Sequence, residues 1–233
     1  MKPAKRSLRR HLPPIALLLH VLLASGQVGA AGNSSVQIKV TGSVVPPACT
    51  IALTAGDTID YGRMQFSELE KERNTILSER NLSFTINCDA PAKLALTLQD
   101  EQPATVVQDL IKGVRGEADA NQMANGLGAV NGVNIGIFYV RVFAGDGSNN
   151  PGALRTLRSQ GLEGWSETPV DAPLYADGSK PVGFSTGQTS VPTAFTTLTG
   201  RLAVQPVIRP SAELPSTHEI FLAGSSTLTV YYQ

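Results

Sequence analysis

Apolar and polar residues alternate with a period of two along several segments of this chain, which is the pattern of a half-buried β-strand. Near the beginning, Val36 and Ile38 share one face of such a segment. At the end, Leu228, Val230 and Tyr232 share one face. The strands predicted from this alternation, or from enrichment in β-branched and aromatic residues, cover residues 36–45, 58–62, 81–88, 93–98, 133–143, 193–208 and 226–233.

Two long segments lack a clear pattern. Residues 100–132 are rich in Gly, Asp and Asn, and residues 153–190 show only weak periodicity. Both therefore predict loop insertions around short strands. No unit of roughly 20 to 50 residues repeats along the chain, so a solenoid or a propeller is not expected. Several strands at irregular spacing, separated by turn residues, predict an all-β fold of the β-sandwich class.

Residues 1–30 have the composition of a cleavable secretory signal peptide. Five Lys and Arg residues precede a short apolar core at residues 15–23, and small residues follow at 28–30. The core is shorter than the roughly 20 residues that a membrane-spanning helix needs, and we expect no membrane insertion. We predict that residues 31–233 form a single domain, exported to the periplasm or to a cell-surface fimbrium.

The loss of the signal peptide changes the charge of the chain. The full sequence has 19 Lys and Arg and 19 Asp and Glu, but residues 1–30 contain five of the basic residues and none of the acidic ones. Residues 31–233 therefore carry a net charge of −5. Such a balance disfavours nucleic acid and anionic membrane surfaces as partners, because both attract basic patches.

Cys49 and Cys88 are the two cysteines of the sequence, and the residues around each of them, 43–51 and 82–88, have the composition of a β-strand. A cysteine pair in an exported chain is expected to oxidise, which predicts one disulfide between two early strands. Closing a loop of about 40 residues would stabilise the fold by about 4 kcal/mol in the chain-entropy model. The alternative is a pair of buried free thiols or a reactive cysteine.

Patterns for catalysis and metal binding are weak. His218 is the only histidine after residue 30, and no serine stands in a nucleophile-elbow pattern that would accompany a catalytic triad. A zinc site would need more His or Cys ligands. Trp165 is able to stack on a sugar, although an aromatic ring packed over the sandwich is the more common arrangement. We therefore predict no catalytic residues, no metal and no cofactor.

Residues 40–50, Val-Thr-Gly-Ser-Val-Val-Pro-Pro-Ala-Cys-Thr, resemble the first strand of chaperone–usher pilus subunits. In that family a glycine and two hydrophobic residues precede a cysteine that bonds to a second cysteine further along the chain, where Cys88 stands here. The alternating C-terminal strand, with Tyr232 as its penultimate residue, resembles the end of a pilin that is handed to a periplasmic chaperone.

A closer resemblance is to the family of uncharacterised exported bacterial proteins typified by the periplasmic protein GltF. It extends over most of the chain after the signal peptide. The segments that carry it are Ala48-Cys49-Thr50, Ile59-Asp60-Tyr61-Gly62, Ile86-Asn87-Cys88-Asp89-Ala90-Pro91, residues 126–132 and the terminal β-strand.

The pilin resemblance implies an immunoglobulin-like sandwich that lacks its last strand and accepts an extended arm from a neighbouring subunit, which is β-augmentation. It implies that Val36 and Ile38 belong to the donor arm. Leu228, Val230 and Tyr232 would lie on the strand that faces the chaperone. The implied partners are a periplasmic chaperone, an usher and neighbouring pilus subunits. The implied function is that of a non-enzymatic fimbrial-type subunit, with cell adhesion among its roles.

Two other functions stay open from the sequence. One is a self-sufficient periplasmic or surface β-sandwich whose long loops bind a ligand such as a carbohydrate. The other is a secreted hydrolase, which needs a cluster of acids or a serine beside His218. An open groove in the sandwich favours the fimbrial subunit, whereas a closing strand of its own favours the ligand-binding protein.

Overall fold

The computed structural model describes residues 33–54, 56–115, 120–147, 154–169, 173–186 and 189–232. The predicted signal peptide, residues 1–30, lies outside these ranges. The chain divides between Val44 and Val45. Residues 33–44 have no regular secondary structure, and we call them the arm. From Val45 onward the chain forms one compact unit.

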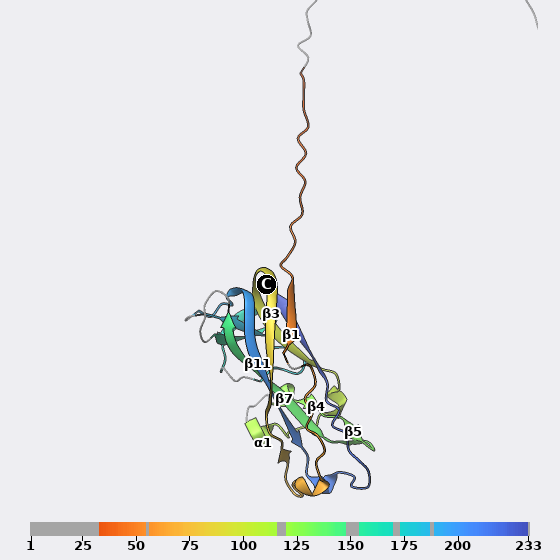
Figure 1. Cartoon of the computed structure of the whole chain (residues 1–233). Coiled ribbons are helices and arrows are strands. Elements are labelled where there is room, and N and C mark those ends of the chain that lie inside the picture. Colours follow the sequence, from red (N-terminus) through yellow and green to blue (C-terminus); the bar gives the residue numbers. More distant parts are fainter. Residues whose placement is uncertain are drawn as a thin grey trace, which may run out of the picture. The chain divides into compact units, whose positions relative to one another are not determined.

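Regular structure in the compact unit is almost entirely β, with short helices between strands (Figure 1). The predicted all-β fold with one disulfide is therefore confirmed. The elements in chain order are β1 (Cys49–Leu53), the 3-10 helix η1 (Phe66–Glu68), β2 (Thr75–Ile76), β3 (Arg80–Asp100), η2 (Pro103–Thr105), α1 (Lys112–Arg115), η3 (Ala120–Met123), β4 (Asn125–Gly126), β5 (Ala129–Val130), β6 (Val133–Asn134), β7 (Gly136–Gly147), β8 (Arg155–Gln160), β9 (Glu163–Glu167), β10 (Val182–Ser185), β11 (Ala194–Ile208), η4 (Ser211–Glu213) and β12 (Ser226–Tyr232).

The 21-residue strand β3 belongs to both layers of the sandwich. Its first half, up to Cys88, pairs with β1 on one side and with β11 on the other. Its second half, from Leu94 onward, pairs with β12 on one side and with β10 on the other. Residues 89–93 connect the two halves, so the two strands predicted at 81–88 and 93–98 are one continuous element. Figure 1 shows its change of direction in yellow.

The pairing of β3 arranges the other strands in two layers. In the first layer the order is β1, β3, β11, β7 and β4, with β2 beside the end of β11. In the second layer the order is β12, β3, β10, β8 and β9. The main hydrophobic core lies between the layers. The predicted inward faces of β3 are buried in it, namely Leu82, Phe84, Ile86, Leu94, Leu96 and Leu98.

The long insertion at residues 100–132 covers the outer face of the first layer. Along β7, Phe138 and Val140 face the main core, whereas Ile137 and Tyr139 belong to a second apolar cluster. Ile111 and other residues from the segment around α1 and η3 complete this second cluster. The insertion therefore protects apolar strand positions that would otherwise face water.

The strand prediction was incomplete at residues 153–190 and wrong at residues 36–45 and 58–62, neither of which contains a strand. The first range contains β8, β9 and β10, and β10 is buried on both faces, so its sequence does not alternate. Residues 58–62 form no strand: the Asp60 side chain accepts a hydrogen bond from the Gly62 N–H at 2.7 Å, and Gly62 has a φ of 67°, outside the extended region.

A test of the packing between the central strands uses Gly200 in β11. A Cβ at this position would lie 2.5 Å from the Phe84 ring and 2.6 Å from the Phe143 carbonyl oxygen. We expect Gly200→Ala to lower the free energy of unfolding by about 1–3 kcal/mol, as overpacking does. Gly113→Ala is the matched control, because a Cβ there meets no atom within 4 Å, and it should be neutral or stabilising. Urea denaturation measures both; equal effects would contradict the prediction.

Candidate functional site

Strands β1 and β12 each pair with β3 alone among the residues that the structure describes. Because β1 pairs with the first half of β3 and β12 with the second half, the two strands are the outer strands of the two layers on the same side of the sandwich. Figure 1 shows β1 in orange next to the dark blue C-terminal strand. Each of them has one edge whose N–H and C=O groups are not used by the sheet.

A cavity of about 670 Å³ opens between these two edges. Ile51 and Leu53 of β1 line one wall, and Leu222 and Leu228 line the other. We call this cavity and its continuation the edge groove. Its floor consists of residues of the main core, namely Leu82, Leu98, Phe138, Val140 and Leu202. An apolar floor of this kind is stabilised when another apolar chain covers it.

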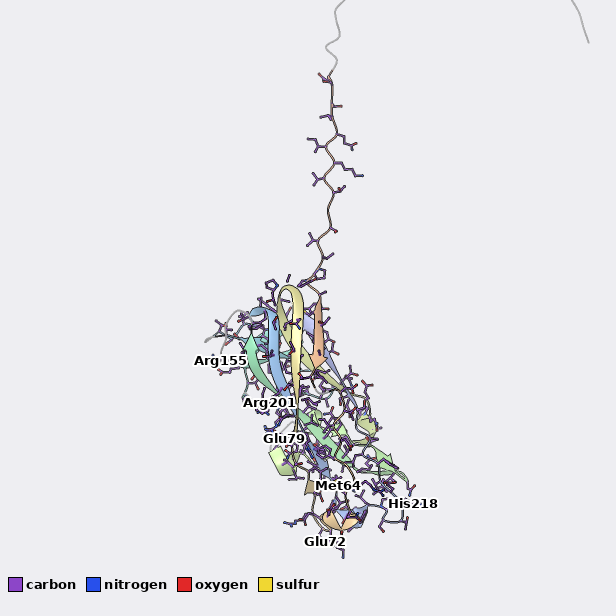
Figure 2. The ribbon with its side chains drawn as sticks, viewed as in Figure 1. Met64, Glu72, Glu79, Arg155, Arg201 and His218 are labelled. Carbon is purple, nitrogen blue, oxygen red and sulfur yellow. A yellow bond between two sulfur atoms is a disulfide. The ribbon has the colours of Figure 1, made fainter. Side chains whose placement is uncertain are left out.

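The edge groove continues beyond β1 and β12. A second cavity of about 650 Å³ shares Ile59, Tyr61 and Leu222 with the first one. It extends to Met64 and His218, which lie at the same end of the compact unit in Figure 2. The walls in this part are the irregular segments 57–66 and 214–225.

Tyr61 holds the first of these irregular walls on the sandwich. Its hydroxyl lies 3.0 Å from the Ser78 carbonyl oxygen and 3.3 Å from the Val204 carbonyl oxygen. Burial raises the pKa of the Tyr61 phenol, and the charge of Arg80 partly offsets this effect. The hydroxyl therefore remains protonated and able to donate its hydrogen bond at neutral pH.

One ion pair joins the two walls at the far end of the edge groove. The Arg63 guanidinium lies 3.4 Å from a Glu219 carboxylate oxygen, and both side chains are exposed. Exposed pairs of this type contribute about 0–1 kcal/mol. This contact therefore contributes little to holding the two walls together.

The wall formed by β1 pairs with β3 over its whole length and is also covalently attached at its beginning. Cys49 is bonded to Cys88, and the two residues face each other in the strand register. Next to them, the Ala48 N–H donates to the Asp89 carboxylate at 2.9 Å, and the Asp89 N–H donates to the Ala48 carbonyl at 3.0 Å. These contacts fix the point at which the chain enters the compact unit.

The three predicted residues of the last strand lie opposite buried leucines of β3. Leu228 and Val230 are half-buried, Leu228 lines the edge groove, and Tyr232 is 44% exposed. In register, Leu228 faces Leu98, Val230 faces Leu96 and Tyr232 faces Leu94. Directly opposite residues of an antiparallel pair share one face of the sheet. Leu228, Val230 and Tyr232 are therefore on the face of β12 that is directed toward the core.

The side chains of the predicted arm residues are exposed to solvent. Val36 and Ile38 are 85% and 83% exposed, and Val40, two positions further on, is equally open. Sequence reasoning did not find the irregular walls, because it predicted a strand at residues 58–62 and no element at residues 214–225. The feature of these segments that could have indicated a wall is the presence of spaced apolar residues among Gly and Pro. Ordinary loops have the same composition.

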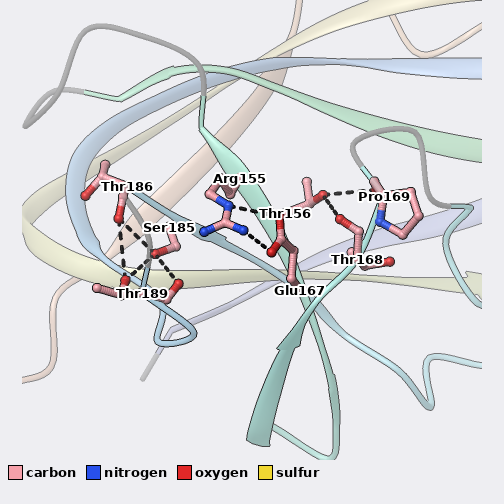
Figure 3. Close-up of polar contacts among 8 residues, drawn as sticks. All are labelled: Arg155, Thr156, Glu167, Thr168, Pro169, Ser185, Thr186 and Thr189. Carbon is pink, nitrogen blue, oxygen red and sulfur yellow. Dashed lines mark hydrogen bonds and ion pairs between the residues drawn. The ribbon is translucent and has the colours of Figure 1, made fainter.

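His218, on which the hydrolase interpretation depends, has Thr217 and not a serine as its hydrogen-bond partner in the described part of the chain. The His218 Nδ1 contacts the Thr217 hydroxyl at 2.8 Å. The buried Ser185 hydroxyl contacts the Thr189 hydroxyl at 2.7 Å (Figure 3). Ser185 lies beside Arg155 in the strand register, and Figure 2 shows Arg155 and His218 at different ends of the compact unit. Within the described ranges, no three His, Cys, Asp or Glu side chains gather as metal ligands.

Trp165 packs against the sandwich. A Cβ on Gly183 of β10 would lie 2.8 Å from the indole ring, so the ring rests directly on that glycine. On the same hairpin, the Arg155 guanidinium pairs with the Glu167 carboxylate, and the Thr156 hydroxyl donates to the Thr168 carbonyl (Figure 3). The indole face against Gly183 is therefore occupied by the protein itself.

Comparison with known proteins agrees with the resemblance found in the sequence. A family model described as a protein of unknown function, DUF1120, matches residues 38–138. Protein GltF of Escherichia coli is 25% identical, and the match covers 96% of this chain and 98% of GltF. The uncharacterized protein YhcF of Escherichia coli is also 25% identical, over 87% of this chain and 92% of YhcF. The chain is similar to GltF and YhcF over most of its length.

The predicted similarity to GltF-like proteins is thus confirmed over nearly the whole chain. A chain from a solved chaperone–usher pilus is 17% identical, with a TM-score of 0.37, and the match covers 86% of this chain and 96% of the pilus chain. In the described part of the chain, no helix is long and apolar enough to cross a membrane.

The attachment of β1 leads to a test of the disulfide. Replacing both cysteines by alanine should lower the free energy of unfolding by about 4 kcal/mol, because the closed loop of 39 residues then opens in the unfolded chain. Urea unfolding with and without dithiothreitol measures this loss. Wild-type protein should respond to the reductant, and the double variant should not. A reductant effect of equal size in both proteins would contradict the prediction.

Proposed function

We propose that this chain is an exported, non-enzymatic subunit of fimbrial type whose edge groove accepts an extended strand from another chain. The observation that carries the proposal is the apolar groove between the free edges of β1 and β12. A strand placed there would pair with both edges and cover the core residues on the groove floor. This arrangement is β-augmentation, in which the main chain gives affinity and alternate side chains enter the groove.

The arm has the properties of such a strand. Val36, Ile38 and Val40 project to one side when the arm is extended, and same-side residues are about 6.6 Å apart along a strand. These apolar side chains are more than 80% exposed in the structure. Exposed apolar residues in a regular row, without a partner surface of their own, favour a role in binding.

The same groove accounts for the other partners that the sequence predicts. A periplasmic chaperone would supply a temporary strand beside Leu228, Val230 and Tyr232, and an usher would coordinate its exchange for the arm of a neighbouring subunit. The protein then works in the periplasm and in a cell-surface fimbrium, where cell adhesion is one outcome of assembly.

A synthetic peptide of residues 33–44 tests the proposal. We expect it to bind the full exported chain and to raise the unfolding free energy by about 2.7 kcal/mol at a free concentration of 100 times its Kd. The control peptide carries Val36→Ser and Ile38→Ser and should not bind, because its apolar row is interrupted. Fluorescence anisotropy and thermal unfolding provide the two measurements.

A pair of groove variants makes the test specific. Leu228→Ser removes an apolar contact from the wall of the edge groove, and we expect it to weaken peptide binding at least tenfold. Tyr231→Ser is the control, because Tyr231 lies three positions after Leu228, on the opposite face of β12. If the folded chain does not bind the peptide, or if both variants bind it as the wild type does, the edge groove is not the binding site of the strand.

A further inference from the structure

We infer that Asn125, in the insertion at residues 100–132, positions one wall of the edge groove through Ser226 and thereby sets the affinity of the groove for an extended strand. The wall in question consists of residues 222–232, and we call it the β12 wall. Asn125 itself does not line the groove, so it acts through the strand that does. The extended strand as ligand rests on the proposed function, whereas the positioning of the wall by the insertion is additional to it.

Asn125 is held in place from several sides. It is fully buried and belongs to the short strand β4, where it lies opposite Phe138 of β7. Its side-chain amide donates to the Phe138 carbonyl oxygen at 3.3 Å. The N–H of the next residue, Gly126, donates to the buried Asp100 carboxylate at 2.8 Å. A Cβ on Gly126 would lie 2.1 Å from the Thr105 hydroxyl oxygen, so β4 has little room to shift. Asn125 is therefore a fixed point for the segment that bonds to it.

The segment bonded to Asn125 is the beginning of β12. The Ser226 hydroxyl donates to the side-chain oxygen of Asn125 at 2.8 Å. Ser226 is the first residue of β12, and it lines the edge groove. The residues before it are also attached to the insertion, because the Ala223 N–H donates to the Leu127 carbonyl oxygen at 3.1 Å. The β12 wall is thus held by the insertion as well as by β3.

The two walls of the edge groove are attached at opposite ends. Strand β1 is bonded through its disulfide beside residues 89–93, where β3 passes between the layers. Tyr232 lies near this end of β12, whereas Ser226 lies opposite Asp100 at the other end of the ladder. Past Thr227, the strand pairing that the structure describes for β12 is its ladder with β3 alone. The contact between Ser226 and the insertion is therefore the main anchor of β12 outside that ladder.

A wall that is fixed in advance raises the affinity of the groove. An incoming strand pairs with the N–H and C=O groups on the free edge of β12, and it binds most strongly where these groups already have the required positions. A fluctuating wall has to be ordered on binding, which costs conformational entropy. The position of the floor depends on the same contact: Phe138 is the register partner of Asn125, and a Cβ on Gly224 of the wall would lie 2.5 Å from the Phe138 ring.

Ser226→Ala tests the inference, because it removes the donor to Asn125 and changes little else. The buried oxygen of Asn125 then has no donor from the strand unless water enters, and this favours opening of the β12 wall. We expect the β12 amides at residues 228–232 to exchange with solvent about tenfold faster in the empty protein. The peptide of residues 33–44 should bind about tenfold more weakly. Hydrogen exchange and fluorescence anisotropy measure the two effects.

Thr227→Ala is the matched control. The Thr227 hydroxyl also donates to a side-chain oxygen of the insertion, that of Glu101 at 2.6 Å, but this contact is exposed. Water can replace a hydrogen bond at an exposed position, so its loss has little effect. Both the exchange of β12 and the binding of the peptide should therefore stay as in the wild type.

The amides of β10 separate positioning from a general loss of stability. Strand β10 pairs with the same half of β3 on its other side, and in Ser226→Ala its exchange should stay as in the wild type. Unchanged exchange in β12, or equal acceleration in β12 and β10, would overturn the inference. Normal peptide binding by Ser226→Ala would overturn it as well. If the wild type does not bind the peptide, the proposed function fails and the effect on affinity fails with it, whereas faster exchange confined to β12 still supports the positioning of the wall by Asn125.

Discussion

The structure depends on the pairing of a single strand, β3, with four neighbours. Each half of β3 has a partner on both sides, and the two halves belong to different layers. Residues 89–93 carry the chain from one layer to the other, and the disulfide lies beside this connection. Because the leucines and phenylalanine of β3 supply much of the main core, the strand also sets the spacing of the layers.

This arrangement explains why the sandwich is closed on one side and open on the other. Away from β1 and β12, each layer continues through further strands, and the insertion around α1 and η3 covers the outer face of β7. On the opposite side each layer ends with one strand attached to β3. The edge groove is therefore a consequence of the topology, and its apolar floor is simply the core seen from the side that no described strand covers.

The elements with strict alternation could be predicted from the sequence, because their side chains face the core on one side and water on the other. The inward residues of β3 and the core-side face of β12 follow directly from a period of two. Cys49 and Cys88 could be paired because the chain has two cysteines. Strand β10 could not be predicted, since all four of its residues are buried and the period disappears.

The groove itself was beyond sequence reasoning for a similar physical reason. A wall residue such as Leu53 or Leu228 has the same apolar character as a residue in a closed core. Only the order of the strands distinguishes an outer strand from a central one, and strand order is a long-range property. Residues 58–62 are a second example: they contain apolar residues spaced as in a strand, but the Asp60 side chain bonds the Gly62 N–H and Gly62 has a positive φ. Local patterns therefore identify candidates for a strand and not their neighbours.

The two parts of the edge groove offer different interactions to an extended chain. Backbone pairing is available along β1 and β12, which have five and seven residues. Beyond them the walls are irregular, Tyr61 is already bonded to the sandwich, and the Arg63–Glu219 ion pair joins the two walls. An incoming strand thus gains main-chain hydrogen bonds over a length close to that of the apolar row from Val36 to Val40. Past that length it gains side-chain contacts alone, so affinity and register are both set by the part of the groove between β1 and β12.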